Sequence, residues 1–242
     1  MNEINCKTFV LNNRLFADSA ISKDENILSV DGVNCNFYQF DVCGSYSDCL
    51  PSTRAYRKLR YDNQSDSYTA LSCCNRTVYC LDGCLNENTA ITLDPAGECT
   101  CACSNPLSLT DASLTRIGNE IFIVGVYTHG AYLYDMNGKP LTQLCRTDKN
   151  ESLTDFIYYG EEKYAMISIK NNMRIVTVSE NGSIKSGIVK PNMSIRMLFE
   201  NDGDVFGLFG KNYIYNRMIP IYANNELTLP ETINDCICTC GQ

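Results

Sequence analysis

The chain has 242 residues, of which 44% are hydrophobic and 20% charged, so its composition is that of a globular protein and excludes a disordered one. Its formal net charge is −8, and its densest basic run, YRKLR at 56–60, is too short to follow a phosphate backbone. We therefore expect neither nucleic acid nor an anionic membrane as a partner. No stretch approaches about 18 consecutive apolar residues, so no membrane insertion is expected.

The first residues, MNEINCKTFVLNN, lack the apolar core of a signal peptide. We therefore expect a cytoplasmic protein, or a secreted one if a leader was removed ahead of Met1. Aromatic and β-branched residues dominate the apolar runs that follow, with 15 Tyr, 9 Phe and no Trp in the chain. Such runs favour strands over helices.

Five segments share one pattern, a strand that opens directly after a polar or acidic turn. In chain order they are ENILSVDG (25–32), DSYTALSCC (66–74), NEIFIVGVY (119–127), EKYAMISIK (162–170) and GDVFGLFGK (203–211). Their starts are 41, 53, 43 and 41 residues apart. The interval of 53 residues contains the first cysteine triplet as an insertion, so the underlying period is about 41 residues and indicates a structural repeat.

Each segment has neighbours with strand character. The preceding strands are expected at 14–22, 56–63, 113–119, 154–160 and 195–201, and the following strands at 36–44, 77–83, 131–138, 174–182 and 212–218. A fourth strand is expected in four of the units, at 90–93, 140–144, 183–189 and 226–229. Asn-Gly pairs at 137–138 and 181–182 predict type I′ hairpin turns, which need positive φ at both central residues.

Four short antiparallel strands per unit of about 41 residues resemble the blades of a β-propeller. The resemblance covers roughly residues 14–229. The sequence lacks the Gly-His and Trp-Asp motifs of WD40 blades, but YDMNG at 134–138 resembles a hairpin common in bacterial propellers. It implies an all-β, five-bladed propeller, with CKTFVL (6–11) as a spare strand that closes the ring. The alternatives are a six-bladed propeller, two packed sheets or an open β-sheet array. We expect one propeller domain over 1–230, with a cysteine-rich insertion at 94–108 and a cysteine-rich tail at 231–242.

The 15 cysteines include two Cys-x-Cys-x-Cys triplets at equivalent places in the second and fifth units. They are Cys99, Cys101 and Cys103, and Cys236, Cys238 and Cys240. Gathered by a turn, these thiolates would suit zinc or another thiophilic metal. Burial as small apolar side chains, disulfides and a tail without fixed structure are the alternatives.

Catalytic motifs are sparse. The single histidine, His129, lies in a predicted turn, and the sequence has no Gly-x-Ser-x-Gly elbow, phosphate-binding loop or Rossmann fingerprint. Some five-bladed propellers are glycoside hydrolases with acids in the central funnel, which makes candidates of the acids beside each unit's second strand. These acids are Asp31, Asp66, Glu120, Glu162 and Asp204. Acids in turns more often bind backbone N–H groups, so we lean against an enzyme.

The sequence thus favours a non-catalytic binding or scaffold propeller that presents one rim to a protein or a small-molecule ligand. Two alternatives remain open. One is a thiol-rich metal-binding or redox protein that uses the two cysteine triplets, and the other is a small glycan-processing hydrolase.

Overall fold

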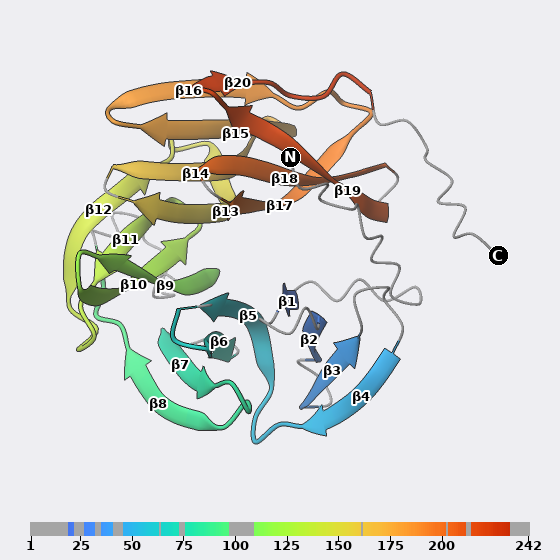
Figure 1. Ribbon diagram of the computed structural model, residues 1–242. Coiled ribbons are helices and arrows are strands. Elements are labelled where there is room, and N and C mark those ends of the chain that lie inside the picture. The colour runs from blue at the N-terminus through green and yellow to red at the C-terminus, as the bar shows by residue number, and fades with distance from the viewer. Residues whose placement is uncertain are drawn as a thin grey trace.

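The computed structural model describes residues 19–21, 27–31, 35–40, 46–62, 64–72, 76–96, 109–160, 162–201, 203–211 and 214–232. Every regular element in these ranges is a strand, so the described part of the chain offers no helix that could cross a membrane. The strands form five four-stranded antiparallel sheets, each made of four consecutive strands (Figure 1).

The sheets follow one another in chain order. The first contains β1 (Ser19–Ile21), β2 (Ile27–Asp31), β3 (Asn36–Phe40) and β4 (Tyr46–Pro51). The second contains β5 (Tyr56–Asp62), β6 (Ser67–Ser72), β7 (Thr77–Asp82) and β8 (Glu87–Thr92). The third contains β9 (Asp111–Ile117), β10 (Glu120–Tyr127), β11 (Gly130–Tyr134) and β12 (Pro140–Arg146). The fourth contains β13 (Glu151–Gly160), β14 (Lys163–Lys170), β15 (Met173–Glu180) and β16 (Ser183–Ile188). The fifth contains β17 (Ser194–Asn201), β18 (Asp204–Lys211), β19 (Ile214–Ala223) and β20 (Glu226–Leu227).

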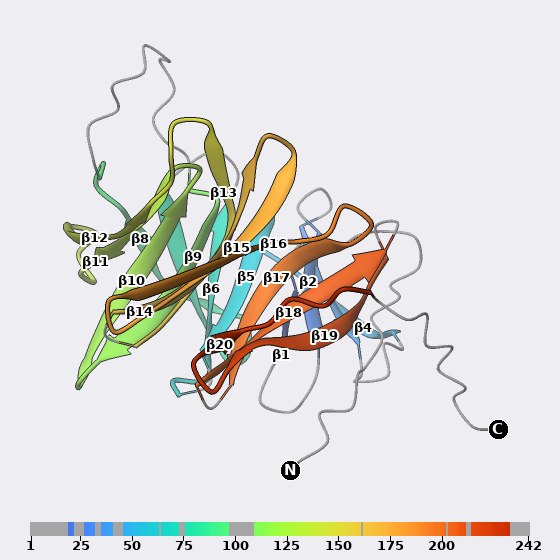
Figure 2. The same cartoon turned by 90° about the horizontal axis from the view of Figure 1, so that it is seen from above.

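The sheets are arranged as in a β-propeller. The first strand of each sheet lies innermost, where β1 contacts β5, β5 contacts β9, β9 contacts β13 and β13 contacts β17. The strands β4, β8, β12 and β16 lie at the periphery (Figure 1), and Figure 2 shows the same sheets from above. The all-β propeller resemblance inferred from the repeat is therefore confirmed.

Burial explains why the second strand of each unit has the clearest sequence signal. β10 is buried continuously from Ile123 to Tyr127, and β14 from Ala165 to Ser168, because a central strand is covered on both faces by neighbouring sheets. The outermost strand β16 has no buried residue, and its sequence is correspondingly more polar.

Separate apolar cores hold consecutive sheets together. The core between the first and second sheets includes Phe37 and Tyr68, and the core between the second and third includes Leu71 and Ile123. The core between the third and fourth sheets includes Val124 and Phe156, and the core between the fourth and fifth includes Ile167 and Phe209. Over the ranges that the structure describes, no such core joins the fifth sheet to the first. The ring closure expected from residues 6–11 lies outside those ranges.

Two local expectations need correction. The fourth strand of the first unit, β4, was not predicted, because YSDCLP has little apolar character and ends in proline. The turn at 181–182 has positive φ at both Asn181 and Gly182, as a type I′ turn requires, but at 137–138 only Gly138 does. Here the Asp135 Oδ1 accepts the N–H groups of Asn137 and Lys139, each at 2.9 Å, and holds a wider turn.

The turn around Gly138 also fastens the third sheet to the second. The N–H of Asp94 donates to the Gly138 carbonyl at 2.8 Å. A Cβ atom on Gly138 would lie 2.3 Å from the carbonyl oxygen of Thr92, so the position excludes any side chain. Gly182, in the equivalent turn of the fourth sheet, would place its Cβ in open space.

Candidate functional site

A repeated tetrapeptide builds the centre of the molecule. Ser-Leu-Thr-Asp occurs at 108–111 and again at 152–155, where it leads into β9 and lies within β13. In both copies the leucine is buried and the threonine hydroxyl donates to a carbonyl of the adjacent second strand at 3.1 Å. The repeat thereby places the two aspartates, Asp111 and Asp155, at equivalent positions on inner strands.

Arg60, on the inner strand β5, joins these two aspartates. Its Nε donates to the Asp111 Oδ2 at 2.9 Å, and its Nη2 donates both to that oxygen and, at 2.7 Å, to the Asp155 Oδ1. The Asp155 Oδ2 accepts the backbone N–H of Leu198, on β17, at 2.6 Å. The Arg60–Asp111–Asp155 cluster therefore links the inner strands of four consecutive sheets.

The three charged side chains of this cluster are nearly excluded from solvent, with exposed fractions of 16% for Arg60, 6% for Asp111 and 3% for Asp155. Burial opposes ionisation of Asp111, but the charges of Arg60 and Lys58, together with the hydrogen bonds that Asp111 accepts, outweigh it and lower the pKa of Asp111. At Asp155, burial outweighs the attraction of Arg60 and raises the pKa. Burial also opposes the charge of Arg60, yet the two carboxylates together raise its pKa.

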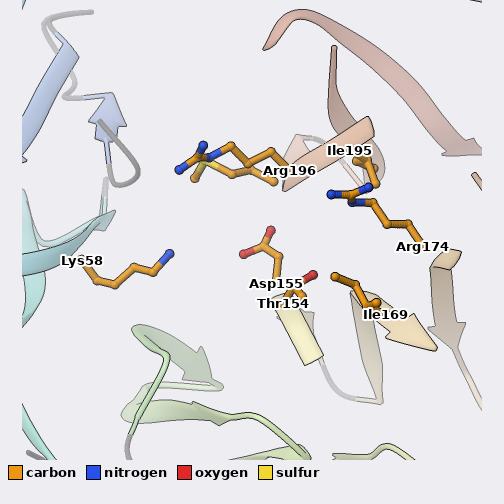
Figure 3. A pocket seen from close by; sticks show the side chains of 8 residues that line it. Lys58, Thr154, Asp155, Ile169, Arg174, Ile195 and Arg196 are labelled. Carbon is orange, nitrogen blue, oxygen red and sulfur yellow. The ribbon is translucent and has the colours of Figure 1, made fainter. Parts of the chain in front are cut away.

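A cavity of about 220 Å³ lies beside this cluster. Its lining combines charged with apolar side chains from β5, β13, β14, β15 and β17, and consists of Lys58, Thr154, Asp155, Ile169, Arg174, Ile195, Arg196 and Met197. Lys58 and Asp155 point toward each other across it, and Arg196 and Arg174 approach from the other sides (Figure 3). We call this space the axial cavity.

The axial cavity lies at one end of the inner strands. Thr154 and Ile195 come early in β13 and β17, and Ile169 and Arg174 flank the turn between β14 and β15. The hairpin turns between the first and second strands of each sheet lie at the opposite end, because a strand runs from one end of a blade to the other.

Four of the five candidate acids do not line the axial cavity. Asp66, Glu120, Glu162 and Asp204 lie in or next to the turns between first and second strands, at the end away from it. Asp66 accepts a hydrogen bond from the Tyr61 hydroxyl at 2.9 Å. The fifth, Asp31, ends β2 and so lies at the end of its sheet opposite to the other four.

The lone histidine is a surface residue. His129 is exposed in the turn between β10 and β11, and its Nδ1 lies 3.0 Å from the carbonyl oxygen of Glu151. No serine or cysteine nucleophile is among the partners of its ring in the part of the chain that the structure describes.

All six triplet cysteines, at 99, 101, 103, 236, 238 and 240, lie outside the described residues. The five cysteines that are described have free thiols, and over the described ranges no group of three His, Cys, Asp or Glu side chains is arranged to hold a metal ion. The proposed thiolate metal site therefore stays a prediction. Among the free thiols, Cys145 is buried, which raises its pKa to about 12, whereas Cys84 is exposed.

Sequence reasoning missed the residues at the centre of the molecule. The sequence predicts a strand at 56–63 and a short basic run within it, but no site there, although this segment contributes both Lys58 and Arg60. The duplicated Ser-Leu-Thr-Asp is the signal that could have identified Asp111 and Asp155, because a polar residue repeated beside buried ones marks a common structural position.

Known structures with a similar backbone show the same fold at low sequence identity. The chain matches a gluconolactonase from Xanthomonas campestris with a TM-score of 0.52 and 11% identity, over 84% of this chain and 74% of that one. It matches the hydrazine synthase of Kuenenia stuttgartiensis with a TM-score of 0.51 and 11% identity, over 79% of this chain and 60% of that one. No protein-family model and no curated protein sequence matches the chain.

These likenesses concern the fold alone. The chain spans about 60% of the length of the hydrazine synthase chain, and the two matched proteins carry different activities in their names. The side chains around the axial cavity, and not the fold, determine what this chain can bind.

Proposed function

We propose that the chain is a non-catalytic binding propeller of five blades, and that its ligand is a small molecule held in the axial cavity. The observation that carries the proposal is the convergence of side chains from three sheets on one space of about 220 Å³ at the end of the inner strands. Binding sites in proteins are concave, mostly preformed and provided with a few convergent polar groups.

Five blades are supported by the five four-stranded sheets and by the similar cores between consecutive sheets. In the proposed ring the fifth sheet packs on the first, which removes two exposed sheet faces from water. Hydrogen exchange tests this closure. The amides of β2 and β18 should be protected from exchange to the same degree as the amides of β10 and β14. Markedly faster exchange in β2 and β18 would favour an open array.

A binding function fits the centre better than hydrolysis does. Asp155, the acid that lines the axial cavity, already has both oxygens occupied by Arg60 and by the Leu198 N–H. A general acid or base must be able to reach the proton that it transfers. The glycan-hydrolase alternative gains no support from Asp66, Glu120, Glu162 and Asp204, because none of these four acids lines the cavity.

A blocked-cavity variant tests the binding site. Ile169→Phe adds bulk to the cavity lining, and Ile188→Phe makes the same change on the exposed surface of β16 in the same sheet. A ligand at 100 times its Kd stabilises a protein by about 2.7 kcal/mol. For a chain of this length that is a rise of about 5–11 °C in melting temperature.

Melting temperatures are measured across a panel of small metabolites. We expect at least one compound to stabilise the wild type and Ile188→Phe but not Ile169→Phe. The proposal fails if every stabilising compound acts equally on Ile169→Phe, or if none stabilises the wild type.

The thiolate metal hypothesis is tested separately, because it concerns other residues. Anaerobically purified protein is analysed for zinc and other thiophilic metals before and after Cys99, Cys101 and Cys103 are changed to serine. Bound metal that disappears in the variant supports the hypothesis, and metal-free wild-type protein with a full count of free thiols contradicts it.

A further inference from the structure

The axial cavity concentrates positive charge in an acidic protein. The chain carries a net charge of −8, yet Lys58, Arg174 and Arg196 line the cavity together with a single acid, Asp155. That acid already accepts hydrogen bonds from Arg60 and from a backbone N–H group, and the Arg60 charge offsets its negative charge. The described lining therefore carries three cationic side chains and one acidic one.

Arg174 contributes a guanidinium group to the cavity lining. It lies next to the β14–β15 turn, opposite Ile169 in the strand register, and is half-buried. Its guanidinium makes no hydrogen bond or ion pair within the described residues, and Figure 3 shows it directed into the cavity beside Ile195. A guanidinium presents five N–H donors in a planar fork that matches the oxygens of a carboxylate or a phosphate.

The rest of the lining strengthens such an interaction. Ile169, Ile195 and Met197 surround the charged groups with apolar atoms, which lowers the local dielectric constant and increases the attraction between opposite charges. Lys58 lies close enough to Asp111 and Asp155 to lower the pKa of both carboxyls, and its amine extends toward the centre of the cavity.

The volume limits the size of the ligand. About 220 Å³ corresponds to about seven water molecules at ~30 Å³ each, and it is below the roughly 300–1,000 Å³ typical of pockets for drug-sized ligands. A phosphate ion or a short carboxylic acid fits this space.

We propose that the axial cavity binds a small oxyanion, a phosphate or a carboxylate group, through the guanidinium of Arg174 with Lys58 and Arg196 adding positive charge. This inference rests on the proposed function, since it names the class of ligand for the same cavity. The shared chemistry is a compact group of oxygens that carries negative charge. Phosphate and carboxylate sources are distinguished by the probes below.

Calorimetric titration at low salt and pH 7 uses three probes: inorganic phosphate, malonate and uncharged glycerol. We expect phosphate or malonate to bind the wild type, glycerol not to bind, and the tighter of the two anions to identify the source. Arg174→Gln should weaken binding about 10- to 100-fold, the usual loss when a hydrogen bond to a charged group is removed. Arg174→Lys keeps the positive charge but loses the planar fork of N–H donors, so its affinity for the anion should lie between those of the wild type and Arg174→Gln.

Arg146→Gln is the matched control, because Arg146 is exposed on β12 and lies outside the cavity lining. It should bind the anion as the wild type does, and the melting temperature of each variant without ligand shows that it is folded. The anion inference is overturned if Arg174→Gln and Arg146→Gln bind phosphate and malonate equally, or if neither anion binds. If an uncharged compound still binds and Ile169→Phe abolishes that binding, the proposed function survives while the anion inference fails.

Discussion

Replacing Arg60 with methionine tests whether the buried ion cluster holds the inner strands together. Methionine keeps the unbranched apolar stem but removes the guanidinium that Asp111 and Asp155 share. Two carboxylates then remain in a site where they are 6% and 3% exposed. Removing one partner of a buried ion pair usually destabilises a protein by about 3–5 kcal/mol, because the remaining charge is neither solvated nor paired.

The expected loss is large compared with the stability of the whole chain, which is typically about 5–15 kcal/mol. For a protein of this length, about 3–5 kcal/mol corresponds to a fall of about 6–20 °C in melting temperature. Urea unfolding followed by far-ultraviolet circular dichroism measures it, since the chain has no tryptophan to report by fluorescence. The double variant Arg60→Met with Asp111→Asn removes one stranded carboxylate and should recover part of the loss.

Lys170→Met is the control for an exposed ion pair. Lys170 is paired with Asp148 on the surface, with exposed fractions of 36% and 71%, and its removal should leave the unfolding midpoint unchanged within error. The reasoning is refuted if Arg60→Met has no larger effect than Lys170→Met, or if Asp111→Asn adds its full effect to that of Arg60→Met. Either result would mean that the cluster contributes no coupling between the sheets.

Three further predictions concern turns, thiols and acid stability. Gly138→Ala should destabilise the protein by about 1–3 kcal/mol more than Gly182→Ala in thermal melts, the usual cost of overpacking. Both residues have positive φ, but only a side chain at 138 would collide with the backbone of the second sheet; equal effects would exclude the collision as the cause. Iodoacetamide at pH 8 should alkylate the exposed Cys84 and leave the buried Cys145 unmodified in mass spectra, since burial raises the pKa of Cys145 to about 12; rapid modification of Cys145 would mean that its sheet opens readily. The pKa of Asp111 is lower in the folded protein than its unfolded value of about 3.9. Ionised Asp111 therefore adds its full contribution to the free energy of unfolding above about pH 4, and this contribution is lost as the pH falls through the folded pKa. Asp111→Asn should therefore be less stable than the wild type at pH 7 and approach it near pH 3 in urea unfolding; a constant difference across this range would contradict the lowered pKa.

The candidate site could be predicted from the sequence only in part. Ser-Leu-Thr-Asp is present twice and marks equivalent positions in two units, so Asp111 and Asp155 were accessible to analysis of the repeat. Arg174 was not, because it follows an ordinary hairpin turn and nothing in its neighbours distinguishes it from a solvent-exposed arginine. Four of the five candidate acids lie where a second strand begins, and these turns are at the end of the sheets away from the axial cavity.

The strands and their grouping follow from the sequence, because they depend on local features. Apolar runs mark the central strands, turn residues mark the hairpins, and the period of about 41 residues marks the four-stranded unit. The approach of Arg60 to Asp111 and Asp155, which are 51 and 95 residues away along the chain, was decided by the tertiary structure alone. The reason is geometric: pairing within a hairpin is set by neighbouring residues, whereas the meeting of inner strands depends on how successive sheets pack and rotate about a shared axis.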